Sequence, residues 1–464
     1  INMFLQIFTN FQGLSRGQFI YLNDLLFSVI YVYISYSIVK RVADKYYKDT
    51  IHYKYLMMAY RVKITCSILF MLVFAFYYKG GDTFAYLGNI VQLRDMLFNY
   101  PTDWYNVVFR TDSWEAFRVM NGFMVNNGTY MTDPSSKVVI IFGFFLSFTC
   151  MSSYLVLCLF FSLFCFYGCW KMYLTFVDMY PALHREMAIA CLFIPSVCFW
   201  GSGLLKDSLC IGFLGIMVFS TYQLFFKRKN IIANIFYIAL STYAISQIKV
   251  YIVLAFAPAL AVWVFARFRY TIKSPFIKAI STPLFMGFGL LGGGLVLSLM
   301  GKYAEKYAFD QMMRTAQDTQ NWLVYSSKET SGSFYTLGNI EYSAFGLLKV
   351  FPAAVNVSLF RPYIWEAKKI MLVFASVEGM VTFGFTVTLL FRAGFVGFFK
   401  LILSNPEVQF CLVFSIIFAF AVGFTSFNFG ALARYKIPFM PFYFIALFIL
   451  ASEQKRDKKP TKKK

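Results

Sequence analysis

Residues 208–229 read SLCIGFLGIMVFSTYQLFFKRK, and this stretch decides the fold class. Its first part, residues 208–226, carries no charged side chain and is about as long as the roughly 20 apolar residues that cross a bilayer as a helix. Three cations follow, Lys227, Arg228 and Lys229. Such clusters mark the cytoplasmic ends of spans. The stretch therefore predicts a transmembrane helix that ends in the cytoplasm.

The composition extends this prediction to the whole chain. Of 464 residues, 59% are hydrophobic and 14% are charged. A soluble domain has about a quarter charged residues and roughly 45–50% apolar ones. Apolar stretches recur along the full length, so we expect an all-α, multi-pass integral membrane protein. A soluble fold is excluded, because one domain lacks the polar surface to cover such a core.

The net charge of +21 at first indicates a nucleic-acid partner. The lysines and arginines, however, concentrate in short segments between apolar stretches, as the positive-inside rule predicts for cytoplasmic loops. The charge therefore indicates topology, and we expect no nucleic-acid partner. Residues 455–464 form a basic tail that is expected in the cytoplasm, against anionic lipid headgroups.

The apolar stretches predict about eleven crossings. The N-terminus is expected outside and the C-terminus inside, because the first crossing is followed by Lys40, Arg41 and further cations up to Lys63. Residues 138–151 are expected to dip into the membrane or lie in its interface. The predicted crossings are residues 23–39, 64–78, 153–174, 187–200, 208–226, 231–247, 251–266, 280–300, 369–390, 408–425 and 437–451.

Two long segments are expected outside, residues 81–137 and 301–369, each with helices that lie on the outer surface. No internal repeat is visible, and residues 1–454 are expected to form one transmembrane domain. The first apolar stretch has no small-residue cleavage site and is read as a span. The cysteines all lie in apolar stretches, which is typical of small buried side chains. No metal site and no cofactor are predicted.

Polar residues gather at the predicted outer ends of the spans, where ionisable groups carry information because they are costly at membrane depth. Asp82 follows Gly80 and Gly81, and it is either a helix N-cap or a catalytic acid. Lys206 and Asp207 end the stretch WGSGLLKD. They form either a neutralised pair or, with the Gly-Ser-Gly turn, a cradle for an anion.

Three more polar positions follow. Lys249 stands alone between two apolar helices and is either a snorkelling lysine or a substrate-binding cation. Residues 361–366, RPYIWE, combine a guanidinium suited to phosphate with aromatic rings that suit sugars or the membrane interface. Residues 428–438, NFGALARYKIP, hold two cations on the face where the positive-inside rule disfavours them, which favours a function. Glu378 lies inside a span and needs a partner.

Together these groups predict a site that holds an anionic lipid-linked donor and activates an acceptor hydroxyl. The carboxylates supply the catalytic groups and the cations and aromatic rings bind the phosphate or the glycan. The predicted catalytic residues are Asp82 and Glu366. The predicted substrate-binding residues are Lys206, Asp207, Lys249, Arg361, Trp365, Arg434 and Tyr435.

At these segments the chain resembles bacterial membrane glycan enzymes, namely O-antigen polymerases of the Wzy type and the GT-C glycosyltransferases. The resemblance implies a catalytic acid at the start of the first outer loop, which is Asp82, and outer-face arginines, which are Arg361 and Arg434. The chain lacks an Asp-x-Asp pattern, which puts a metal-dependent GT-C mechanism in doubt. It also lacks an outer-face histidine, which counts against an O-antigen ligase.

The leading hypothesis is a membrane glycosyltransferase or polymerase at the outer face of a bacterial inner membrane. Its donor would be a polyprenyl-(pyro)phosphate-linked glycan and its acceptor a glycan or a protein. Membrane lipids are expected partners, and a protein partner stays open. One alternative is a transporter or flippase for a lipid-linked or anionic substrate. Another is a non-catalytic membrane subunit of an envelope or secretion complex.

Overall fold

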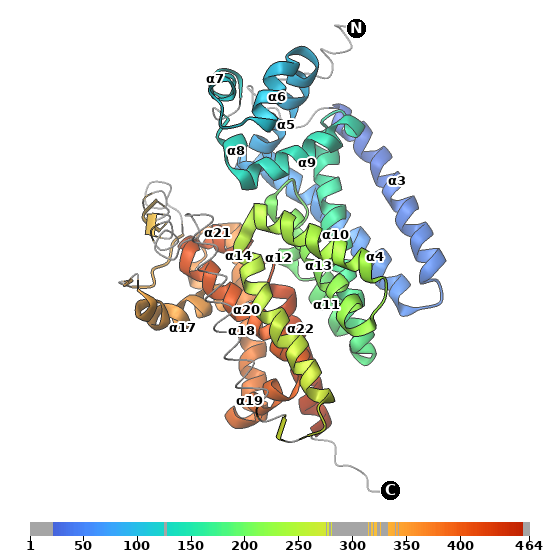
Figure 1. The fold of residues 1–464 in the computed structure, drawn as a ribbon, viewed down its shortest axis with the longest axis vertical. Helices are drawn as coiled ribbons and strands as arrows, with labels where there is room; N and C mark the ends of the chain where they lie inside the picture. The colour runs from blue at the N-terminus through green and yellow to red at the C-terminus, as the bar shows by residue number, and fades with distance from the viewer. Residues whose placement is uncertain are drawn as a thin grey trace. The chain divides into compact units, whose positions relative to one another are not determined.

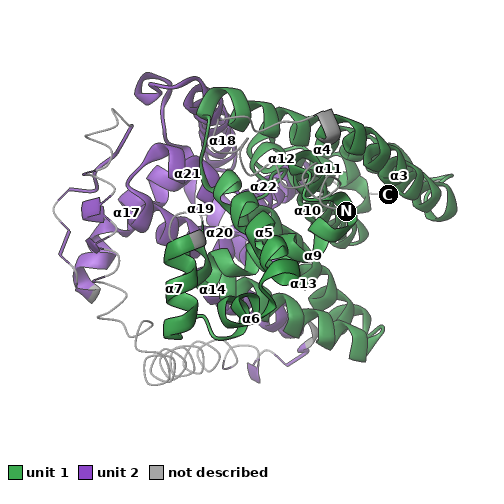
Figure 2. Ribbon diagram, turned by 90° about the horizontal axis from the view of Figure 1, so that it is seen from above, with its two compact units in different colours: residues 1–250 green, residues 251–464 purple. Residues whose placement is uncertain are grey.

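A computed structural model describes residues 22–124, 128–274, 276–277, 280, 314, 317–318, 320–322, 325, 333–338, 340–341 and 343–457. Over these residues the chain is helical, apart from turns and one isolated antiparallel β-bridge between Phe334 and Asn428 (Figure 1). The predicted all-α class is confirmed for this part of the chain. The chain divides into two compact units, residues 1–250 and 251–464 (Figure 2). Each unit is described by itself.

The first unit, unit 1, is built around α10. Its elements are α3 (Leu22–Tyr46), α4 (Ile51–Leu72), the π-turn η1 (Val73–Tyr78), α5 (Asp82–Asn99), α6 (Pro101–Phe109), α7 (Trp114–Phe123), α8 (Thr129–Thr132), α9 (Pro134–Cys150), α10 (Tyr154–Met179), η3 (Pro181–Leu183), α11 (His184–Leu192), α12 (Pro195–Trp200), α13 (Lys206–Tyr222), the π-turn η4 (Gln223–Lys227) and the first limb of α14 (Ile231–Thr271). Helix α10 contacts α3, α4, α9, α11 and α13. It is therefore the centre of the unit.

Glycines let α10 and α13 approach closely. A Cβ atom on Gly168 would lie 2.2 Å from the carbonyl oxygen of Gly212, and one on Gly215 would lie 2.0 Å from the carbonyl oxygen of Gly168. Small residues at such positions are the usual means by which membrane helices pack backbone against backbone. Any larger side chain at these positions forces α10 and α13 apart.

The second unit, unit 2, is built around α20. Its elements are the second limb of α14, α17 (Ala344–Phe360), η6 (Ile364–Glu366), α18 (Ile370–Ala393), α19 (Phe395–Ser404), α20 (Pro406–Ser426), α21 (Phe429–Tyr435) and α22 (Met440–Asp457). Helix α20 packs on α17 and α22, and α18 packs on α22. The core is aromatic: Trp263 stacks on Phe410 at 4.4 Å, and Phe414 meets Phe442 at 4.5 Å between ring centroids. Such rings contribute large buried area with defined geometry.

Seven described helices are long and apolar enough to cross a membrane, or eight if the bent pair α21 and α22 counts as one span. The structure thus has several candidate membrane helices, as predicted, but it does not confirm the count of about eleven. Three differences account for the gap. Helix α14 counts once although Lys249 interrupts it, residues 187–200 form two short helices instead of one, and nearly all of residues 280–300 lie outside the described part.

The predicted outer segments are more deeply packed than expected. Residues 83–90 of α5 are all buried, so α5 is a core helix of unit 1 and not a surface helix. Helix α17 is amphipathic in its packing: Ala354 and Val357 are buried, whereas Phe345 and Leu348 are exposed. Eight of the nine cysteines are buried and all are free thiols, which confirms their predicted burial.

Candidate functional site

Asp82 lies where the chain enters α5. The backbone turns through Lys79 and Gly81, which have positive φ values of 50° and 105°. Gly81 is the N-cap and Asp82 is the first helical residue, so the N-cap alternative for Asp82 is wrong. Its carboxylate stabilises the positive end of the helix dipole. The carboxylate also accepts a hydrogen bond of 3.2 Å from the hydroxyl of Tyr130, in α8.

Asp133 joins α8 and α9 to the start of α13. Its carboxylate is the N-cap of α9 and accepts hydrogen bonds from the N–H and hydroxyl groups of Ser135 and Ser136. The ammonium of Lys206 lies 2.9 Å from Asp133 and 2.6 Å from the Ser135 hydroxyl. Burial opposes ionisation of Asp133, but the hydrogen bonds from Ser136, Ser135 and Lys206 and the lysine charge hold its pKa well below the usual range. Asp133 is not among the site residues predicted from the sequence, although Asp-Pro-Ser-Ser is a typical helix start.

A buried, unwound segment separates α12 from α13. Residues 201–205 are not helical and all are buried. Glycine is required within it, because a Cβ atom on Gly203 would lie 2.0 Å from the ring of Phe70. Unwound backbone at membrane depth is tolerated where protein or a cavity surrounds it. The segment places Lys206 and Asp207 at the first turn of α13.

Lys206 and Asp207 have separate partners. Asp207 forms a salt bridge with Lys249, and the two side chains are 0% and 6% exposed. Lys249 is the non-helical residue that interrupts α14. The prediction that Lys206 and Asp207 neutralise each other is therefore wrong, and so is the prediction that Lys249 snorkels. Burial of both charges makes each the required counterion of the other.

Unit 1 thus brings four predicted residues into one connected group. We call it the carboxylate–lysine cluster: Asp82, Tyr130, Asp133, Lys206, Asp207 and Lys249. Asp82 contacts Tyr130 in α8, and α8 leads directly to Asp133 at the start of α9. Asp133 pairs with Lys206. Asp207, the next residue in the chain, pairs with Lys249.

Lys63 is a second buried cation of unit 1. Its side chain is 2% exposed, and its ammonium donates to the carbonyl oxygens of Val197 and Gly201 at 3.2 and 3.1 Å. It also lies 3.3 Å from the sulfur of Cys165. The prediction that Lys63 lies in a loop before the second span is wrong, because α4 already begins at residue 51. Its charge instead satisfies carbonyls at the end of α12.

In unit 2, Arg361 and Glu366 bind each other. Arginine Nε lies 3.0 Å from one carboxylate oxygen and 3.1 Å from the other, and the N–H of Tyr363 donates to Glu366 at 2.8 Å. Burial raises the pKa of Glu366, but the bonds from Arg361 and Tyr363 and the arginine charge outweigh it and lower the pKa. Glu366 is therefore held ionised and orients Arg361. Its predicted catalytic role remains a prediction.

Aromatic rings surround the Arg361 guanidinium. Its carbon lies 5.2 Å from the ring centroid of Phe429, 5.9 Å from that of Tyr363 and 6.0 Å from that of Tyr335. These are cation–π distances. Trp365 stacks on Tyr363 at 5.0 Å and is 76% exposed. An exposed indole beside a held guanidinium is suited to bind a sugar ring.

Helix α21 carries the other predicted cation of unit 2. Asn428 caps it by accepting from the N–H groups of Gly430 and Ala431. Arg434 lies over the ring of Tyr435 at 5.9 Å, and both side chains are partly exposed. Because Phe429 begins α21 and contacts Arg361, these residues form one group. We call it the arginine–aromatic cluster: Tyr335, Arg361, Tyr363, Trp365, Glu366, Phe429, Arg434 and Tyr435.

Glu378 is a buried carboxylate of unit 2. It lies in α18 and interacts electrostatically with Lys436, which directly follows α21. Both side chains are buried. This interaction links α18 to the turn between α21 and α22.

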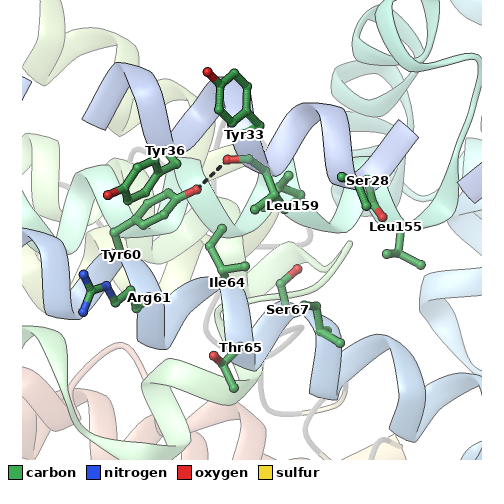
Figure 3. Close-up of a pocket in the computed structure, with 13 residues that line it drawn as sticks. Ser28, Tyr33, Tyr36, Tyr60, Arg61, Ile64, Thr65, Ser67, Leu155 and Leu159 are labelled. Atoms are coloured by element: carbon green, nitrogen blue, oxygen red, sulfur yellow. Dashed lines mark hydrogen bonds between the residues drawn. The ribbon is translucent and has the colours of Figure 1, made fainter. Parts of the chain in front are cut away.

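An apolar cavity of about 610 Å³ lies between α3, α4 and α10 (Figure 3). Val32, Ile64 and Leu159 are among its lining residues, and the hydroxyl of Tyr60 donates to the Val32 carbonyl at 3.0 Å. Arg61 lies at the cavity wall. The lining suits a hydrocarbon chain.

Among the described residues, no group of three or more His, Cys, Asp or Glu side chains is placed to hold a metal ion. Comparison with protein-family models, curated proteins and solved structures finds no match to this chain. The function is therefore argued from the residues of the chain itself.

Proposed function

We propose that this chain is a multi-pass enzyme of the bacterial inner membrane that transfers or polymerises glycan from a polyprenyl-(pyro)phosphate donor at the outer face. The observation that carries the proposal is the carboxylate–lysine cluster, in which residues far apart in the chain form polar contacts: Tyr130 with Asp82, Lys206 with Asp133, and Lys249 with Asp207. Asp133 forms a salt bridge with Lys206, Asp207 forms one with Lys249, and Asp82 accepts a hydrogen bond from the Tyr130 hydroxyl. We assign Asp82 to the acceptor because it opens α5, at the start of the first predicted outer segment.

The arginine–aromatic cluster is assigned to the donor. A guanidinium offers a planar set of donors that matches phosphate oxygens, and Arg361 is held in place by Glu366. Arg434 adds a second guanidinium on α21. The exposed Trp365 is assigned to the glycan.

The proposed reaction is glycosyl transfer. The bond between the anomeric carbon and the phosphate oxygen breaks, and a bond from that carbon to the acceptor oxygen forms. The acceptor proton passes to Asp82 as general base. Negative charge grows on the departing phosphate, and cations and hydrogen-bond donors stabilise such charge.

The proposal includes about eleven crossings with the N-terminus outside. Support comes from α14, whose limbs at residues 231–248 and 250–271 are each long enough to cross the membrane. Reporter fusions after residues 99 and 229 test the orientation. Activity of a periplasmic reporter at residue 99 and of a cytoplasmic reporter at 229 is expected, and the reverse result contradicts the topology.

The test of the chemistry is glycan formation in proteoliposomes that contain the purified chain and a polyprenyl-pyrophosphate oligosaccharide. We expect Asp82→Asn to lower the rate about 100-fold or more, because it removes a general base. Asp95→Asn is the matched control, since Asp95 lies exposed on the same helix. Full activity of the Asp82 variant contradicts the assignment.

The donor site is tested by a second pair of variants. Arg434→Gln is expected to lower the rate about 100-fold through lost charge stabilisation. Arg392→Gln, at an exposed arginine in the last turn of α18, is expected to be close to wild type. Equal rates for the two variants contradict the role of Arg434.

A transporter is the second candidate, and the break between α12 and α13 favours it. Buried Lys63 contacts carbonyls of this break, and the Asp207–Lys249 pair adjoins it. Discontinuous helices with ionisable groups are typical of transporter sites. Movement of a fluorescent lipid-linked oligosaccharide across the proteoliposome membrane, without new glycosidic bonds, supports this candidate over the enzyme.

A further inference from the structure

A second cavity, of about 530 Å³, lies at the far end of α13 from Lys206. Helix α13 and η4 together span residues 206–227, which corresponds to about 30 Å of helix. This length matches the hydrocarbon thickness of a bilayer. The polar residues of its lining are His52, Asp178, His184, Gln223, Lys227 and Lys229. The two histidines are the only ones in the sequence.

Tyrosines orient both imidazole rings. His52 Nδ1 lies 2.8 Å from the hydroxyl of Tyr173, and His184 Nδ1 lies 2.8 Å from that of Tyr55. With Nδ1 engaged in each ring, Nε2 is the nitrogen that a ligand can use. The cavity therefore holds two preoriented imidazoles from different helices, α4 and α11.

The charge in the cavity is positive. The carboxylate of Asp178 forms a salt bridge of 2.7 Å with Lys227. It also accepts a hydrogen bond of 2.6 Å from the Tyr222 hydroxyl. Lys227 thus compensates the carboxylate, and Lys229 adds a further positive charge.

We propose that this cavity binds a phosphate group, carried either by a lipid headgroup or by a soluble phosphate compound. Lysine ammonium, imidazole N–H and the Gln223 amide are all donors, and charge-assisted hydrogen bonds to phosphate oxygens are strong. The site is distinct from both clusters described above and does not depend on the proposed glycan chemistry. Its phosphate would lie about one bilayer thickness from Lys206.

The experiment measures binding to the purified full chain in two arms. In detergent, inorganic phosphate is titrated by calorimetry. In nanodiscs, native mass spectrometry compares retention of phosphatidylglycerol with that of phosphatidylcholine. Saturable binding of inorganic phosphate identifies a soluble ligand, whereas selective retention of phosphatidylglycerol alone identifies a headgroup. Absence of both overturns the proposal.

Three variants assign the binding to this cavity. Lys229→Gln and Gln223→Glu are expected to weaken it about 5-fold or more, because each makes the cavity less positive at little change in size. Arg228→Gln is the control, since Arg228 is an exposed cation next to the cavity that does not line it. Unchanged binding in Gln223→Glu, with melting like wild type, overturns the proposal.

Discussion

The two polar clusters differ in how far apart in the chain their partners lie. In unit 1, Lys206 and Asp133 are 73 residues apart, and Lys249 and Asp207 are 42 apart. In unit 2, Arg361 and Glu366 are only five apart. The long-range pair Lys249–Asp207 is almost fully buried, whereas Arg361 and Glu366 are 22% and 18% exposed. The carboxylate–lysine cluster is thus part of the tertiary structure of its unit, and the arginine pair is a local motif.

The largest effect is expected at the buried pair. Lys249→Met leaves the Asp207 carboxylate buried without its counterion, so the free energy of unfolding should fall by about 3–5 kcal/mol. Denaturant titration of the purified protein in micelles measures it. The double variant Lys249→Met/Asp207→Leu removes both charges and should regain most of the loss. If the double variant stays as unstable as the single one, the salt bridge is not the source of the cost.

The next effect concerns helix packing. Gly215→Ala in unit 1 should cost about 1–3 kcal/mol, because the new methyl group would overlap the backbone of α10. Gly384→Ala in unit 2 is the control, since nothing lies within 4 Å of its Cβ position. That substitution should be neutral or stabilising by up to about 1 kcal/mol, from helix propensity. Thermal melting of both variants measures the change in stability. An equal loss of stability in the two variants contradicts the close approach of α10 and α13.

A smaller effect is expected at the local pair. Arg361→Gln should lower the free energy of unfolding by about 1–2 kcal/mol, because Glu366 keeps the N–H of Tyr363 and some contact with solvent. The same denaturant titration measures it. A loss as large as that of Lys249→Met would remove the distinction between the long-range and the local pair.

The smallest expected effect is a change in the pH dependence of stability at acidic pH. The pKa values of Asp133 and Glu366 are both lowered by folding, so each carboxylate stabilises the fold above its unfolded pKa of about 4. This contribution disappears as the pH falls through the lower folded value. Between pH 4 and 2, Asp133→Asn and Glu366→Gln should each make stability less pH-dependent, by up to about one proton. Unchanged slopes in both variants contradict the assigned pairing.

Local features of the molecule could be predicted from the sequence. Apolar length located most of the candidate membrane helices, and the isolated Lys249 marked the interruption of α14. Residues 361–366 formed a group because they are neighbours in the chain. Each of these features depends only on residues within one or two turns, and such patterns are directly visible in a sequence.

Long-range pairing could not be predicted. Lys206 and Asp207 are adjacent and opposite in charge, which favoured a pair, but successive residues on a helix point about 100° apart. Their partners, Asp133 and Lys249, come from other helices. Lys63 was misplaced for another reason: α4 extends well before the apolar stretch, so a cation next to that stretch is inside the helix.

Lys63 also has a consequence for biosynthesis. The carbonyls that receive its ammonium, at Val197 and Gly201, are 134 and 138 residues further along the chain. At about 5–20 residues per second, the ribosome needs roughly 7–27 seconds to make them after Lys63. During this interval α4 carries a lysine whose entry into the hydrocarbon costs about 2.5–3.5 kcal/mol. We therefore expect α4 to remain at the translocon or near the headgroups until α12 emerges, so that the order of synthesis delays its final insertion.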